Sequence, residues 1–101
     1  MAFVTVARFS SLVEGEGVCV DAGGKKLALF RVGHLCYAID DVCPHRDAPL
    51  HEGWVEGLEV ECPLHASRFH LETGAFRNPP ARRGVTAYRC QVVGDDVQVD
   101  V

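Results

Sequence analysis

The 101-residue sequence has no long hydrophobic run, and none of its apolar stretches approaches the ~20 residues of a membrane-spanning helix. Helical periodicity is not sustained over three turns anywhere in the chain. The first residues show no cationic stretch followed by an apolar one, which is the pattern of a secretory signal peptide. We therefore expect a cytoplasmic protein that does not bind membranes.

The sequence also lacks an excess of positive charge. It has 10 Lys and Arg against 14 Asp and Glu, for a net charge of −4. Such a chain does not carry the basic surface that binds nucleic-acid phosphates, and an acidic surface fits a basic protein partner better. Its 48% hydrophobic and 24% charged residues are typical of a globular protein. We expect one domain, residues 1–101.

Five cysteines are present, and an odd number without a secretion signal argues against a disulfide framework. In a reducing compartment the cysteines are expected to be thiols or metal ligands. Cys19, Cys36 and Cys90 have apolar neighbours in strand-like patterns. Since unmodified cysteine is among the most buried residue types, we interpret these three as core residues.

Short apolar stretches separated by glycine-rich turns predict an all-β fold. The turns expected between strands are 22–25, the Gly33-His34 hairpin loop and 94–96. The expected strands are 3–9, 18–21, 26–32, 35–40, 58–61, 85–93 and 97–101.

Residues 43–80 differ from the rest, because prolines and histidines are concentrated there. We interpret residues 1–41 and 81–101 as an antiparallel β scaffold, a sandwich or barrel, that carries a loop-rich insert at 42–80. Functional residues are usually found on loops held by a rigid scaffold, so the insert is the candidate site.

The insert contains two short motifs that pair a cysteine with a histidine. Cys43-Pro44-His45 is followed, after sixteen residues, by Cys62-Pro63-Leu64-His65. Two thiolates and two imidazoles suit either tetrahedral zinc or a [2Fe–2S] cluster in which two histidines bind one iron. Structural zinc sites usually pair Cys with Cys and His with His, whereas each motif here is mixed. The spacing therefore favours the cluster without excluding zinc.

The paired motif resembles that of Rieske-type [2Fe–2S] proteins. The stretch from Cys62 to Gly74 resembles the second cluster loop of that family, and residues 78–81 lie where the family has a proline loop that covers the cluster. The resemblance implies a Rieske-like β scaffold with an inserted cluster-binding subdomain. A length near 100 residues is similar to the small ferredoxins of bacterial ring-hydroxylating dioxygenases.

The resemblance implies a role for each residue of the motif. Cys43 and Cys62 would bind the inner iron, and His45 and His65 the outer, redox-active iron. Pro79 and Pro80 would shield the cluster, and the hydroxyl of Ser67 would point toward a bridging sulfide. His51 and His70 lack a cysteine at matching spacing, so we expect both to lie at the surface or around the centre without binding it.

The leading functional hypothesis is a one-electron carrier, without catalytic residues of its own, in aromatic hydrocarbon catabolism. A monomeric ferredoxin would pass electrons from a flavin-dependent reductase to a terminal aromatic-ring dioxygenase, docking transiently at the edge formed by His45 and His65. The small subunit of an assimilatory NAD(P)H nitrite reductase is the alternative, and a zinc-stabilised interaction module without redox activity is a third. Glutamates in the insert are expected to make the cluster end negative and to guide docking: Glu52, Glu56, Glu59, Glu61 and Glu72.

Overall fold

The computed structural model of the protein describes residues 2–44, 48–64, 67–79, 81 and 83–101. Over these ranges the regular elements are strands, apart from two single-turn 3₁₀ helices, η1 (Phe9–Ser11) and η2 (Leu50–Glu52). No helix in this part of the chain is long and apolar enough to cross a membrane. The predicted all-β class is confirmed.

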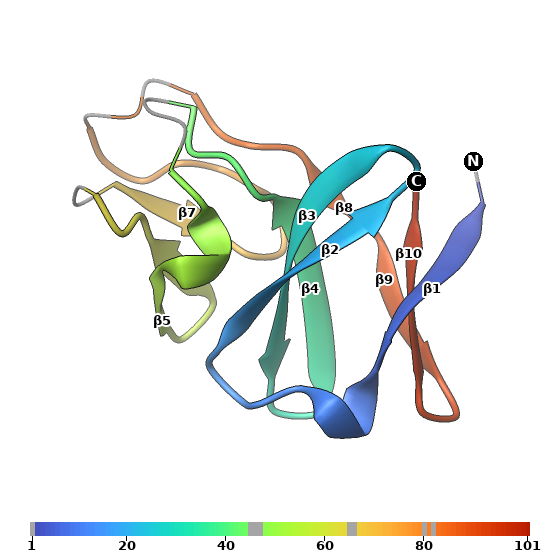
Figure 1. Cartoon of the computed structure of the whole chain (residues 1–101). Helices are drawn as coiled ribbons and strands as arrows, with labels where there is room; N and C mark the ends of the chain where they lie inside the picture. The colour runs from blue at the N-terminus through green and yellow to red at the C-terminus, as the bar shows by residue number, and fades with distance from the viewer. Residues whose placement is uncertain (1, 45–47, 65–66, 80, 82) are drawn as a thin grey trace.

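The strands form three antiparallel sheets, which Figure 1 shows with the third sheet beside the other two. The first sheet has the order β1-β10-β9, from β1 (Phe3–Arg8), β9 (Cys90–Val93) and β10 (Asp96–Asp100). The second has the order β2-β3-β4-β8, from β2 (Gly17–Ala22), β3 (Lys25–Val32), β4 (Leu35–Asp40) and β8 (Ala87–Tyr88). The third has the order β5-β6-β7, from β5 (Trp54–Glu56), β6 (Glu59–Glu61) and β7 (Arg68–His70).

The hairpin between β2 and β3 follows the turn chemistry predicted from the sequence. Gly23 and Gly24 have φ values of +57° and +76°, and Ala22 pairs with Lys25 across the turn. Two successive residues with positive φ match the right-handed twist of a hairpin and favour glycine. The sequence therefore predicts this turn from its local steric requirement alone.

The single strand predicted over residues 85–93 is wrong. β8 pairs with β4 in the second sheet, whereas β9 pairs with β10 in the first, and the chain changes sheets at Arg89. The Arg89 carbonyl still accepts a hydrogen bond from the backbone of Asp100. Side chains continue to alternate where the chain passes from one sheet to the other. The sequence pattern therefore cannot show with which strand each half of residues 85–93 pairs.

The central strand β3 is buried on both faces and separates two hydrophobic clusters. Leu27 and Leu29 pack in a cluster with Val97 and Val99 of the first sheet. Ala28 and Phe30 point the other way, into a cluster with residues 43–81. This second cluster holds the candidate site against the scaffold.

The third sheet consists only of strands from residues 54–70, and the other two only of strands from residues 3–40 and 87–100. The precise boundaries of the insert, 42–80, stay a prediction.

Gly74 joins the segment after β7 to the segment before β8, because its carbonyl accepts a hydrogen bond from Val85 N. Gly74 has φ +78°, and a Cβ there would overlap the backbone oxygen of Val85. Gly94, with φ +64° and open space around it, is the matched control. An alanine in this conformation costs about 1–2 kcal/mol, and overpacking adds roughly 1–3 kcal/mol.

We expect Gly74→Ala to lower the free energy of unfolding by roughly 2–5 kcal/mol and Gly94→Ala by about 1–2 kcal/mol, measured by denaturant unfolding of the two variants. Equal losses would contradict the close approach of Val85 to Gly74.

Candidate metal centre

The first candidate loop begins at Cys43, three residues after the end of β4 at Asp40. The backbone N–H of Cys43 donates a 3.0 Å hydrogen bond to the carbonyl of Ala48. Cys43 and Ala48 are each only 1% exposed, so both ends of the loop are buried. This hydrogen bond joins the first residue of the motif to Ala48.

The second candidate loop is closed in the same way. The backbone N–H of Cys62, which follows β6, donates a 2.9 Å hydrogen bond to the carbonyl of Ser67. Cys62 and Ser67 are both fully buried. In each loop the cysteine N–H therefore donates to the carbonyl five residues later. The two motifs thus share the same backbone hydrogen bond, although they follow different strands.

The structure brings the two cysteines of the motifs into one hydrophobic cluster. Cys43 and Cys62 belong to it together with Val60, Phe69 and Ala81. Two buried thiols from two loops fit the pair of soft sulfur ligands that an iron–sulfur cluster or a zinc ion requires. His45, His65 and Pro80 lie outside the residues that the structure describes.

The proline segment after β7 is hydrogen-bonded to the second loop on both sides of the two prolines. The Oδ1 of Asn78 accepts a 2.9 Å hydrogen bond from Arg68 N. The Oγ of Ser67 accepts a 2.8 Å hydrogen bond from Ala81 N. Pro79, between them, is exposed. These two bonds hold the proline segment next to the Cys62 loop; the sequence places the prolines there but does not reveal the bonds.

The other three cysteines are outside the two motifs, and one differs from its prediction. Cys36 is buried and Cys90 half-buried, and both belong to the cluster between the first two sheets. Their thiols share a hydrogen bond, which lowers the pKa of Cys36 and, with burial, raises that of Cys90. Cys19 is exposed. It lies on β2, at the edge of the second sheet, where no strand covers it.

Sequence reasoning missed the contact that joins the two ends of the first loop region. Asp41, two residues before Cys43, is 6% exposed. Its Oδ1 accepts a 2.7 Å hydrogen bond from His51 N, and its Oδ2 lies 2.6 Å from His51 Nδ1. Only the fold reveals this pairing. His70 lies on β7, where its Nδ1 accepts a hydrogen bond from Glu72 N.

The expected negative charge of the third sheet is largely neutralised. Arg68 lies 2.8 Å from Glu56 and 3.3 Å from Glu61, and Arg77 lies 2.8 Å from Glu59. The sequence did not indicate these ion pairs, because Arg68 comes into line with Glu61 only through the pairing of β6 with β7. The glutamates on β5 and β6 therefore present less net charge than their number suggests.

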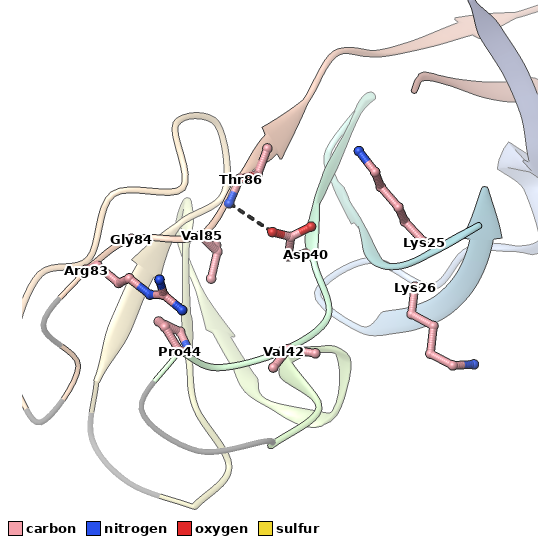
Figure 2. Close-up of a pocket in the computed structure, with 9 residues that line it drawn as sticks. All are labelled: Lys25, Lys26, Asp40, Val42, Pro44, Arg83, Gly84, Val85 and Thr86. Carbon is pink, nitrogen blue, oxygen red and sulfur yellow. Dashed lines mark hydrogen bonds between the residues drawn. The ribbon is translucent and has the colours of Figure 1, made fainter. Parts of the chain in front are cut away.

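Basic side chains lie next to the first loop instead. A cavity of about 420 Å³ opens beside Pro44 and is also lined by Lys25, Lys26, Arg83 and Asp40. Figure 2 shows Arg83 extending toward Pro44, with Asp40 bonded to the backbone of Thr86. Three cations and one anion line this cavity, an excess of positive charge that is reduced by Asp21, which lies 3.5 Å from Lys26.

The comparisons with known proteins agree with these features. The family model described as "Rieske [2Fe-2S] domain" matches residues 2–89. The ferredoxin component of the naphthalene 1,2-dioxygenase system of Pseudomonas putida is 33% identical over 98% of this chain and 95% of its own length. The ferredoxin subunit of the 3-phenylpropionate/cinnamic acid dioxygenase of Escherichia coli is 43% identical over 87% of this chain and 83% of its own length.

Solved structures give the same result. The ferredoxin of carbazole 1,9a-dioxygenase from Nocardioides aromaticivorans has a TM-score of 0.93 and 36% identity, covering 98% of this chain and 97% of its own. A complex of reduced oxygenase and oxidized ferredoxin in carbazole 1,9a-dioxygenase has a chain with a TM-score of 0.88 and 32% identity, over 96% of this chain and 91% of that one. A putative NADH-dependent nitrite reductase small subunit from Mycobacterium tuberculosis has a TM-score of 0.88 and 26% identity, over 97% and 93% of the two chains.

The segment that carries Arg83 is held to β4 by Tyr88, and this contact predicts a pH effect. The hydroxyl of Tyr88 donates a 2.7 Å hydrogen bond to Asp40. Burial, followed by the bond to Asp40, raises the pKa of Tyr88 from 10.0 to about 12. The protonated Tyr88 hydroxyl stabilises the folded state. This contribution to the free energy of unfolding is fully present below pH 10.0 and is lost as the pH rises toward 12.

A spectrophotometric titration should show a tyrosine that ionises near pH 12. In Tyr88→Phe this transition should disappear. Its persistence in Tyr88→Phe would show that Asp40 does not hold the Tyr88 proton.

Proposed function

Because the chain belongs to the Rieske [2Fe–2S] domain family, we propose that it is a one-electron carrier, the ferredoxin component of a ring-hydroxylating dioxygenase system. The observation that carries this proposal is the match, over nearly the full length of both chains, to ferredoxins of such systems. The chain is a carrier rather than a catalyst, as its relatives are electron-transfer components.

The chain holds one [2Fe–2S] cluster, which supplies a site that accepts and returns one electron. We propose that Cys43 and Cys62 bind one iron and that His45 and His65 bind the other. The burial of both cysteines supports their part of this assignment. The closed loops keep water away from the thiolates, and the hydrogen bonds of Asn78 and Ser67 keep the proline segment beside them.

The ligand set determines the direction in which the redox potential differs from that of a four-cysteine ferredoxin. Two thiolates instead of four leave the oxidised centre neutral rather than doubly negative. An electron is added more readily to a neutral centre than to an anion, so imidazole ligation raises the potential.

The partners in this proposal are a flavin-dependent reductase and a terminal aromatic-ring oxygenase, which dock in turn at the edge carrying His45 and His65. Each loop has an exposed apolar residue near its cysteine: Val42 is 45% exposed and Leu64 is 66% exposed. An apolar contact beside a basic rim suits brief docking to an acidic surface. We propose that the protein acts as a cytoplasmic monomer.

A nitrite reductase small subunit is the second candidate, supported by the 26% identical structure. The higher identity to dioxygenase ferredoxins favours the first candidate.

Electron transfer between purified components tests the proposed function. We expect the reduced protein to hold one electron per chain and to be reoxidised on mixing with a substrate-loaded ring-hydroxylating oxygenase. Cys90→Ser, which changes a thiol outside the two loops, should behave like the wild type. Reoxidation by a siroheme nitrite reductase subunit but by no oxygenase would favour the second candidate.

The proposed ligands are tested by iron content and visible absorption. We expect Cys43→Ser, Cys62→Ser, His45→Ala and His65→Ala to lose most of the iron, because metal binding and loop folding are coupled. Cys36→Ser and Cys90→Ser should retain full iron. A histidine variant that keeps full iron and an unchanged spectrum would show that the ligand assignment is wrong.

Ser67→Ala tests whether the buried hydroxyl tunes the potential. A hydrogen bond to an acceptor that gains negative charge on reduction becomes stronger, so its loss should lower the midpoint potential. About 1.4 kcal/mol corresponds to ~59 mV for one electron, and we expect a decrease of roughly tens of millivolts with the cluster intact. Voltammetry measures this, with Ser11→Ala, an exposed serine far along the chain, as the control. An unchanged potential in Ser67→Ala would contradict the role.

A further inference from the structure

Three side chains able to bind a metal meet outside the candidate centre already described. Cys19 of β2, Asp41 after β4 and His51 of η2 place one ligand atom each within 4.8 Å of one another. They come from three separate segments, and neither the electron-transfer proposal nor the Rieske motif uses them. Their chemistry, one thiol, one carboxylate and one imidazole, is that of a mixed transition-metal site.

The close approach of η2 to β2 explains why Cys19 reaches the other two. Gly17 has no side chain, and a Cβ there would lie 2.6 Å from the carbonyl oxygen of His51. Residues two apart on a strand share a face, so Cys19 projects on the same side as the η2 contact. Its Sγ lies within 4.8 Å of an Asp41 carboxylate oxygen. The backbone, rather than flexible side chains alone, therefore brings the three groups together.

Asp41 provides an anchored ligand at the centre of this group. It is 6% exposed, and both of its carboxylate oxygens contact His51, at 2.7 Å to the backbone nitrogen and 2.6 Å to Nδ1. Cys19 is exposed, which gives a dissolved ion access to the site. The buried Asp41 carboxylate and the exposed Cys19 thiol beside it thus supply two of the four ligands that a tetrahedral metal site needs.

We propose that Cys19 Sγ, the Asp41 carboxylate and His51 Nδ1 form a second metal site that binds one Zn²⁺, with a water molecule as the fourth ligand. Zinc accepts sulfur, nitrogen and oxygen ligands together in a tetrahedral site. Binding displaces the thiol proton of Cys19 to solvent, and the imidazole proton moves from Nδ1 to Nε2. The metal is neither oxidised nor reduced.

The surroundings of His51 suit this arrangement. Its Nε2 lies 3.8 Å from the carboxylate of Glu52, the kind of partner that usually receives the second N–H of a metal-bound histidine. Zinc bonds of about 2.0–2.1 Å keep neighbouring nitrogen and oxygen ligands roughly 3.3 Å apart. The 2.6 Å contact between Asp41 and His51 must therefore widen slightly. The His51 side chain is 25% exposed and lines a cavity beside Gly17 and Glu52.

Zinc binding to the iron-loaded protein tests the proposal. We expect one zinc per chain after gel filtration, with unchanged iron content and visible absorption. X-ray absorption at the zinc edge should show one sulfur ligand and three nitrogen or oxygen ligands. Cys19→Ser, at an exposed strand position, should weaken zinc binding about tenfold or more in a chelator competition. His51→Gln should do the same.

Cys90→Ser is the matched control, because it removes a thiol elsewhere and should bind zinc like the wild type. Equal zinc affinity of the wild type and Cys19→Ser would overturn the proposal, as would the absence of retained zinc. Two sulfur ligands at the zinc edge, or zinc uptake matched by iron loss, would show zinc in the Cys43 and Cys62 loops and would also overturn it. None of these outcomes depends on whether the protein serves an oxygenase.

Discussion

Two buried cysteine thiols, Cys43 and Cys62, are the constraint on which the functional half of this protein depends. As the proposed iron ligands they would be thiolates, and a thiolate in an apolar cluster is costly unless a cation neutralises it. The same cluster includes Phe30 of the scaffold and Phe69 of the third sheet. Under the proposed ligand assignment, metal binding, packing of the third sheet and closure of the two loops would be parts of one folding event.

Backbone hydrogen bonds also hold the segments around these thiols in place. In both loops the cysteine N–H bonds the carbonyl five residues later, at Ala48 and at Ser67. The side chain of Ser67 then receives the N–H of Ala81, which follows the prolines. A single serine thus connects the second loop to the proline segment through its backbone on one side and its hydroxyl on the other. This double use explains why a residue with a small polar side chain is fully buried there.

Charge is distributed differently from what the net charge of −4 suggests. Arg68 and Arg77 neutralise glutamates on the third sheet, while Lys25, Lys26 and Arg83 surround the cavity beside Pro44. Most of these pairs are exposed and contribute little to stability. Their effect is on the distribution of charge, because more cations than anions line the cavity beside Pro44. The net negative charge of the chain favours a basic partner at long range, whereas the basic residues beside Pro44 favour acidic groups at close range.

The all-β class, the hairpin turns and the identity of the paired Cys-His motifs could be predicted from the amino-acid sequence. Each of these depends on local chemistry: positive φ at Gly23 and Gly24, alternation along β3, or ligand types two and three residues apart. The tertiary structure alone decided features that depend on residues far apart in the chain. It divided the strand expected at 85–93 between two sheets, left Cys19 exposed on an edge strand and joined Asp41 to His51. A pattern along one strand does not specify its neighbours, because pairing and side-chain contacts depend on how the whole chain packs.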